Sequence, residues 1–155
     1  DEVVPLAREV EYAKGYLTIQ KMRYKDKLEF EIDVEPSILN IPLIKLVLQP
    51  IIENAIYHGL KYKESKGLLQ VKGFMKDGNA VLQVIDNGVG MDEETLSHIY
   101  DKHKVNYHSN GVGVYNVQKR LKLYYGENYG ITYESEKGVG TTATITIPGI
   151  QEESI

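Results

Sequence analysis

The sequence predicts an α/β fold, a two-layer sandwich in which one mixed, mainly antiparallel sheet carries helices on one face. Several short segments alternate apolar and polar residues, which is typical of half-buried strands. Two pairs of these segments flank glycine-containing turns at residues 76–79 and 137–140, which indicates antiparallel hairpins. Helical periodicity separates the strands, and a single sheet covered on one side accommodates this order most simply.

The first half of the chain is expected to contain two helices around one strand. Residues 3–23 repeat apolar side chains every three or four positions, which predicts a helix. Residues 28–34 alternate apolar and acidic side chains, which predicts a strand. Pro42 suits the first turn of the second helix, which is expected to reach His58 and to have a kink or a local irregularity at Pro50.

The second half is expected to contain two hairpins separated by helices. The pair Asp77–Gly78 is a strong signal for a tight turn in the first hairpin. Asp92 is expected to cap a short helix that ends near Tyr100. Residues 101–113 are polar and predict a mobile loop, and residues 114–125 predict the last helix.

Composition excludes several classes of protein. The 155 residues suit one domain, with 42% hydrophobic and 26% charged residues and a net charge of −4. The acidic balance argues against a nucleic-acid partner. Cysteine is absent, which excludes disulfides and thiolate metal sites. No apolar run approaches the ~20 residues of a membrane span. The chain begins with Asp1, which suggests a fragment of a longer protein.

Three segments carry residues suited to ligand binding. In ENAIYHG (53–59), Asn54 and His58 are four residues apart and share a helix face, although a plain solvated face would look the same. In DNGVGM (86–91), Asp86 ends a strand beside two glycines, one more than a turn needs, although a turn alone is an equal alternative.

The third segment, GVGVYN (111–116), places glycines directly before a helix. Free backbone N–H groups and the positive end of the helix dipole would then converge, which suits a phosphate. The segment is not the Rossmann fingerprint, because Asn116 occupies the place of the third glycine.

Together, ENAIYHG, DNGVGM, GVGVYN and GVGTTATITIP resemble the nucleotide-binding domain of the GHKL superfamily, which includes gyrase, the heat-shock-ninety chaperones, MutL and histidine kinases. QPIIENAIYHG and NVQKRLKLYYGENYGITYESEKGVGTT resemble the LytS/YesM-type sensor histidine kinases of bacteria. The resemblance covers about residues 40–148. It implies a Bergerat-type ATP-binding fold, with ATP and Mg²⁺ as cofactors.

The resemblance also implies roles for the residues around the base and the metal. Asn54 would bind the magnesium ion, and His58 would approach the phosphates or the ribose. Asp86 would accept a hydrogen bond from the adenine amino group. Thr141, rather than its neighbour Thr142, would support adenine through a water molecule.

The glycine-rich segments would line the nucleotide. Gly88 and Gly90 would let the backbone lie against the base, and Met91 would pack on the ring. The backbone at the hinge of the lid would face the phosphates, and its residues are Gly111, Val112, Gly113 and Val114.

The sequence departs from the pattern in three places. Gyrase-like ATPases carry a glutamate four residues before the magnesium asparagine, and this chain has Pro50, which cannot act as a base. Glu53 is rotated away from that face, so self-contained ATP hydrolysis is not expected. Tyr57 stands where many histidine kinases carry a lysine, which removes one positive charge from near the phosphates. Lys61 or Lys63 could compensate for that charge. The lid, residues 101–113, is short and lacks the usual phenylalanine motif.

The resemblance implies the catalytic domain of a two-component protein histidine kinase, whose phosphoacceptor histidine lies outside this chain. Residues 1–25 would be a linker helix from the dimerisation and phosphoacceptor helices, residues 26–150 the ATP-binding domain and residues 151–155 a tail. The partners would be those helices, a response regulator and, in the full-length protein, a second copy. The domain would be cytoplasmic and the parent membrane-bound.

Two alternatives remain open at this stage. One is a stand-alone serine kinase of the anti-sigma-factor type, which has a similar length and the same nucleotide motifs. The other is a non-catalytic nucleotide-sensing module, which Pro50 and Tyr57 favour.

Overall fold

The main sheet is mixed and mainly antiparallel, as the sequence predicts. A computed structural model describes residues 2–60, 63–100 and 111–150. The order of the five strands is β2-β4-β5-β7-β6, in which β2 and β4 are parallel and the other neighbours antiparallel. The strands are β2 (Leu28–Val34), β4 (Gly67–Lys76), β5 (Asn79–Asp86), β6 (Gly130–Glu136) and β7 (Gly140–Pro148).

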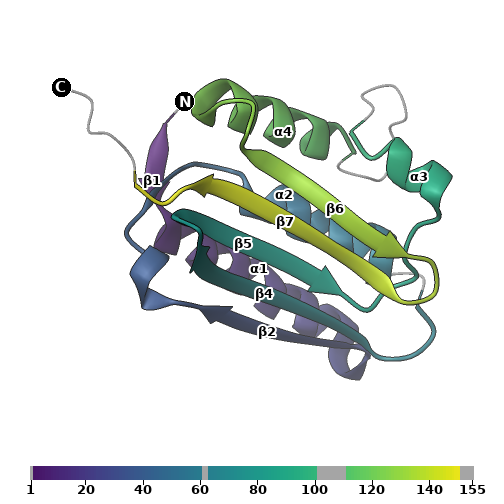
Figure 1. Cartoon of the computed structure of the whole chain (residues 1–155). Coiled ribbons are helices and arrows are strands. Elements are labelled where there is room, and N and C mark those ends of the chain that lie inside the picture. The colour runs from purple at the N-terminus through teal and green to yellow at the C-terminus, as the bar shows by residue number, and fades with distance from the viewer. Residues whose placement is uncertain (1, 61–62, 101–110, 151–155) are drawn as a thin grey trace.

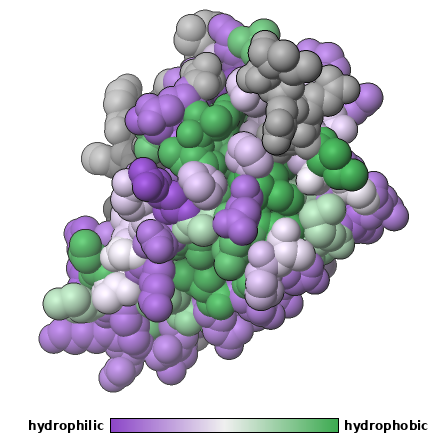
Figure 2. All heavy atoms as spheres, turned by 90° about the vertical axis from the view of Figure 1, so that its left-hand side faces the viewer, coloured by the Kyte–Doolittle hydropathy of each residue, from purple (hydrophilic) through white to green (hydrophobic). Residues whose placement is uncertain are grey.

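Three helices cover one face of this sheet (Figure 1). They are α1 (Leu6–Tyr24), α2 (Leu48–Asn54) and α4 (Gly111–Tyr125). The hydrophobic core lies between the two layers and draws on all three helices. Figure 2 views the sandwich from one end and shows a band of hydrophobic residues between two hydrophilic sides. No helix in the described ranges combines the length and hydrophobicity of a membrane-crossing segment.

Both predicted helices of the first half begin too early. Residues before each helix instead form short strands, β1 (Val3–Pro5) and β3 (Pro42–Ile44), which pair antiparallel in a two-stranded sheet. Leu46 then adopts a φ of 62°, which cannot continue into a helix, so α2 begins only at Leu48. The expectation that Pro42 opens this helix was therefore wrong.

Pro50 does not interrupt α2. It is the third helical residue, where the backbone N–H would have no partner within the helix, so proline is tolerated there. The irregularity comes after Asn54, where the chain continues as a π-helical turn, η3 (Ala55–Leu60). Such turns are rare in proteins, and those that occur are often found at functional sites.

The second half follows the sequence closely. Both hairpins form, and Asp77 and Gly78 occupy the first turn with positive φ. The Asp92 side chain caps α3 (Glu93–Ser97) by accepting a hydrogen bond from the Thr95 N–H at 2.8 Å. This helix ends three residues before the expected Tyr100.

The last helix starts earlier than predicted. Helix α4 begins at Gly111 rather than Val114, so residues 111–113 belong to a helix and not to a loop. Residues 101–110 of the expected loop and the expected tail 151–155 lie outside the described residues.

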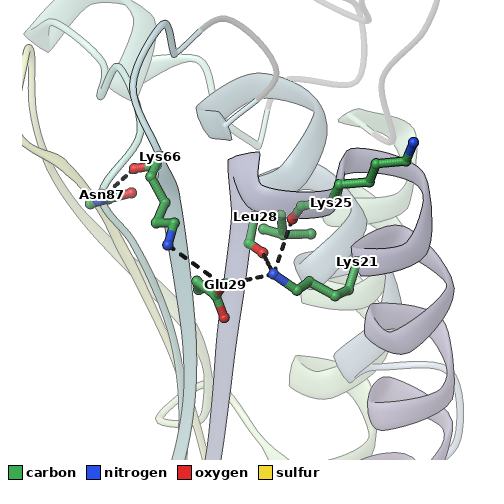
Figure 3. A network of polar contacts seen from close by, with 6 residues as sticks. All are labelled: Lys21, Lys25, Leu28, Glu29, Lys66 and Asn87. Carbon is green, nitrogen blue, oxygen red and sulfur yellow. Dashed lines mark hydrogen bonds and ion pairs between the residues drawn. The ribbon is translucent and has the colours of Figure 1, made fainter.

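Helix α1 packs into the same core as the rest of the domain. Leu6, Ala13 and Leu17 are completely buried there. At the C-terminal end of the helix, the Lys21 ammonium donates to the Leu28 carbonyl and to the Glu29 carboxylate, each at 2.7 Å (Figure 3). Glu29 also lies 3.6 Å from the Lys66 ammonium. These contacts attach α1 to β2 and to the residue before β4.

The chain just before α2 is held by side chains from both neighbouring helices. The buried Glu9 carboxylate of α1 accepts hydrogen bonds from the backbone N–H groups of Leu46, Val47 and Leu48, at 2.8–3.2 Å. From α4, the Arg120 guanidinium donates to the carbonyls of Lys45 and Leu46. We call residues 45–48 the α2 junction, because α1, α2 and α4 meet there.

Candidate functional site

A cavity of ≈ 420 Å³ lies between α2, η3, α3 and the inner face of β5, β7 and β6. This volume is within the usual range for small-molecule sites. Six residues that the sequence singles out line it together: Asn54, His58, Asp86, Gly90, Met91 and Thr141. They come from three separate segments of the chain, and only the fold brings them to one place.

Asp86 stands at the end of β5 with its carboxylate buried. Its Oδ1 accepts a hydrogen bond from the Gly88 N–H at 2.8 Å. Burial raises the pKa of Asp86 from 3.8 to about 6, although hydrogen bonds from the backbone of Gly88 and Thr141 lower it. A carboxylate so placed can accept one further hydrogen bond from a ligand in the cavity.

The two glycines after Asp86 are required by backbone packing. A Cβ on Gly88 would overlap the carbonyl group of Gly59 in η3. Gly90 has a φ of 70°, and a Cβ there would overlap the carbonyl oxygen of Glu136. Gly88 is not among the described residues that line the cavity, whereas Gly90 is. The glycines therefore let this loop lie directly on η3 and on the end of β6.

Further hydrogen bonds fix the loop after Asp86 in this position. The Val89 N–H donates to the Gly59 carbonyl at 3.0 Å, and the Gly138 N–H donates to the Val89 carbonyl at 2.7 Å. The Met91 N–H donates to the Ser135 hydroxyl at 2.8 Å. That hydroxyl lies 2.7 Å from the Thr141 hydroxyl, so Thr141 is held as part of the same arrangement.

The Asn54 and His58 side chains approach the cavity from the helix layer. Asn54 is the last residue of α2 and is buried, with only 7% of its surface exposed. Burial lowers the pKa of His58, so its imidazole is neutral at neutral pH and cannot act there as a fixed cation. The Tyr57 ring packs edge-on against the His58 ring, with their centroids 5.2 Å apart.

Neither Glu53 nor Lys63, the described residues that were considered for the missing base and the missing cation, lines this cavity. Glu53 does not line the cavity, and its charge contributes to the raised pKa of Tyr16 on α1. Lys63 lines a separate small cavity with Tyr24 and Leu28. Lys61 is outside the described residues.

Two residues of the first turn of α4 lie outside the lining of this cavity. Val114 is fully buried in the hydrophobic core. Neither Val114 nor Gly113 is among the described residues that line the cavity. The backbone of Gly111 and Val112 forms part of the same helical turn.

Sequence reasoning missed several residues that line the cavity. Glu94, Thr95, His98 and Ile99 approach it from α3 and the chain after it, and Tyr133 approaches it from β6. His98 is exposed and lies at this cavity. The α3 residues follow the Asp86 segment directly in the sequence, and this proximity could have indicated that they lie near the site. Tyr133 reaches the cavity only through the pairing of β6 with β7.

The protein groups at the cavity suit a metal ion that is bound mainly through a phosphate ligand and water. Among the described residues, no group of three or more His, Cys, Asp or Glu side chains is placed to bind a metal alone. Asn54 offers one amide oxygen at the cavity. Magnesium retains waters and is bound through few protein groups together with phosphate oxygens, so this sparse set is compatible with it.

Comparison with known proteins identifies the family. Residues 40–151 match the profile of the histidine kinase-, DNA gyrase B- and HSP90-like ATPases. The chain belongs to this family.

Relatives of this ATPase chain include sensor kinases. It is 31% identical over 147 residues to the sensor histidine kinase YesM of Bacillus subtilis, covering 95% of the chain and 24% of YesM. It is 35% identical over 130 residues to the sensor protein LytS of Oceanobacillus iheyensis, covering 83% of the chain and 22% of LytS. The chain thus spans about a quarter of the length of these relatives and is homologous to the ATPase domain of sensor histidine kinases.

Solved structures share the ATPase fold. The nucleotide-free catalytic domain of the histidine kinase ThkA matches with a TM-score of 0.72 at 13% identity, covering 96% of this chain and 99% of that one. The mycobacterial sensor histidine kinase MprB matches with a TM-score of 0.68 at 20% identity, covering 95% and 96% of the two chains. These similarities confirm the predicted α/β fold class.

Proposed function

We propose that this chain is the ATP-binding catalytic domain of a two-component sensor histidine kinase, which transfers the γ-phosphoryl group of ATP to a histidine outside residues 1–155. The observation that supports it most directly is the convergence of Asn54, His58, Asp86 and Thr141 on one cavity of a family ATPase domain. The relatives that carry this domain are sensor kinases.

The residues at the sheet end of the cavity would recognise adenine. The buried Asp86 carboxylate would accept a hydrogen from the adenine amino group, and the neighbouring Thr141 hydroxyl would hold a water against the ring. Met91 would pack on the face of the base. Guanine carries an oxygen where adenine carries its amino group, so the carboxylate would oppose it and reject GTP.

The residues at the helix end would hold the triphosphate. The Asn54 amide oxygen would take one position on a magnesium ion, which when bound neutralises charge on the phosphates. The neutral His58 imidazole would donate a hydrogen bond to the phosphates or the ribose. The backbone of the first turn of α4, with Gly111, Val112, Gly113 and Val114, would face the phosphates.

The chain is better suited to phosphoryl transfer than to hydrolysis. The residue four positions before Asn54 is Pro50, which carries no base and does not line the cavity. Of the described acidic side chains that line it, Asp86 would be at the adenine end and Glu94 is exposed on α3. Phosphoryl transfer depends mainly on positioning and charge stabilisation, which the site can supply without a base at position 50.

The partners follow from the same proposal. The acceptor histidine would be on dimerisation helices of the same protein, within a homodimer, and a response regulator would receive the phosphoryl group next. Residues 1–25 would connect these helices to the catalytic domain. The parent protein would be anchored in the membrane, with this domain in the cytoplasm.

Calorimetric titration with ATP and GTP, each with and without Mg²⁺, tests the proposal. We expect magnesium-dependent binding of ATP and at least tenfold weaker binding of GTP. Asp86→Asn should abolish adenine recognition while leaving the fold intact, because the amide oxygen would keep the bond to the Gly88 N–H and the NH₂ group would oppose the adenine amino group. Unchanged ATP binding by this variant would refute the assignment of the cavity.

A non-catalytic nucleotide-sensing module is the second candidate. It is favoured by Tyr57, which stands in place of a lysine, and by His58, whose lowered pKa leaves it neutral at neutral pH. It predicts ATP binding without transfer to an added acceptor domain, so incubation with radiolabelled ATP and the acceptor helices of a related kinase distinguishes the two functions.

A further inference from the structure

We propose that the Tyr133 hydroxyl is a positioning group that orients the Asn54 amide toward a bound nucleotide. The inference rests on the proposed function of the cavity as an ATP site. Within the described part of the chain, the Tyr133 hydroxyl oxygen is the single buried side-chain polar atom that has no hydrogen-bond partner.

An unpartnered buried hydroxyl calls for a reason. Burying such a group without a partner is unfavourable, so nearly all buried polar groups in proteins are paired. Replacing tyrosine by phenylalanine would remove the unpaired group and keep the ring. A functional state in which the hydroxyl gains a partner would explain why the oxygen is present.

The register of the sheet directs the Tyr133 ring into the cavity. Tyr133 of β6 pairs with Ala143 of β7, which in turn pairs with Val84 of β5, and all three line the cavity. The Tyr100 ring packs edge-on against the Tyr133 ring, with centroids 5.9 Å apart, and so restricts its movement. The Tyr100 hydroxyl itself is satisfied, since it donates to the Ile131 carbonyl at 2.6 Å.

Asn54 is the polar neighbour suited to pair with Tyr133. Burial raises the pKa of the Tyr133 hydroxyl, the nearby Tyr100 hydroxyl and Asp86 carboxylate raise it further, and the Asn54 amide lowers it. Asn54 and Tyr133 also line the same cavity, so the amide and the hydroxyl share one environment. The two groups nevertheless do not reach hydrogen-bond geometry in this structure.

The orientation of the Asn54 amide decides which of its two polar groups faces the cavity. An asparagine side chain carries an acceptor oxygen and a donor NH₂ group. When the NH₂ group donates to the Tyr133 hydroxyl, the oxygen is left to face the cavity. That is the end that a magnesium ion requires, and groups that orient a metal ligand commonly contribute to metal affinity. The hydroxyl would thus favour nucleotides that bring a metal to Asn54.

Tyr133→Phe tests this inference by comparing two ligands. We expect the Kd for ATP with Mg²⁺ to rise about 3- to 10-fold, the effect of losing one neutral hydrogen bond. The Kd for adenosine, which brings no phosphate or metal to Asn54, should change less than twofold. The melting temperature of the ligand-free variant should be unchanged or higher, because the unpaired hydroxyl is gone.

Two further variants separate positioning from general packing. Tyr100→Phe removes a satisfied hydroxyl from the adjacent ring outside the cavity, so it should lower the melting temperature and leave the ratio of the two affinities unchanged. In an Asn54→Ala background, Tyr133→Phe should produce no further loss of binding, because a positioning residue acts through the group that it positions.

The outcomes that would overturn the inference are distinct from those for the function. If the unsubstituted chain binds neither ATP nor adenosine, the proposed function fails and this inference fails with it. If the chain binds ATP with Mg²⁺ and Tyr133→Phe binds it equally well, only the inference is refuted. Equal weakening for ATP and adenosine would make Tyr133 part of the cavity wall and would also refute the positioning role.

Discussion

At the scale of single residues, the site depends on a carboxyl group whose charge is unfavourable in the folded protein. Burial raises the pKa of Asp86 to about 6, against 3.8 in the unfolded chain. The folded state therefore holds this proton more tightly than the unfolded state. The resulting stabilisation is complete below pH ~4 and is lost as pH rises through ~6, because the charged group must then be buried.

Asp86→Asn should change how stability depends on pH. The amide stays neutral, so the variant should gain stability relative to the parent between pH 4 and pH 7. The expected gain is at most about 3 kcal/mol, from a pKa shift of roughly two units. Urea unfolding at a series of pH values measures it, with the exposed Asp33→Asn of β2 as the control. A stability difference that does not vary with pH would contradict the expectation.

At the scale of secondary-structure elements, sequence reasoning succeeded where the signals are local. The Asp77–Gly78 turn and the Asp92 cap were predicted because each depends on neighbouring residues alone. The pairing of β1 with β3 was missed, since three-residue strands have no measurable period and their partner is distant in the chain. The π-helical turn η3 was missed for a similar reason, because it depends on packing against the loop at Gly88.

The α2 junction is the element-scale feature that most directly supports the site. The Glu9 carboxylate binds three backbone N–H groups at the start of α2, where the helix dipole also favours negative charge. Arg120 binds carbonyl groups of the same residues from α4. Helix α2, which ends at Asn54, is thereby held by the two helices beside it.

Glu9→Gln should weaken this junction. One oxygen is replaced by an NH₂ group that faces backbone donors, so we expect the free energy of unfolding to fall by about 2–3 kcal/mol. Glu11→Gln, on the exposed side of α1, is the matched control and should stay within about 0.5 kcal/mol of the parent. Urea unfolding measures both, and equal effects would argue against a special role for Glu9.

At the scale of the whole molecule, the fold class and family could be recognised from the sequence because hairpins and motifs are contiguous. The cavity could be anticipated only in part. Asn54 and Asp86 belong to recognisable motifs, whereas Tyr133 has no motif and enters the cavity through the register of three strands. Glu9 likewise gains its role only when α1 packs beside α2.

The parallel pairing of β2 with β4 has a kinetic consequence. Leu28 pairs with Gly67, so this contact closes a long loop that contains all of α2, whereas β4–β5 and β6–β7 are joined by short turns. Long loops close late, and hairpins form early. The Asn54 side of the cavity should therefore be assembled after the rate-limiting step of folding. Stopped-flow experiments should then find that ATP with Mg²⁺ slows unfolding and leaves the refolding rate unchanged, so that a bound nucleotide extends the lifetime of the native state without hastening its formation.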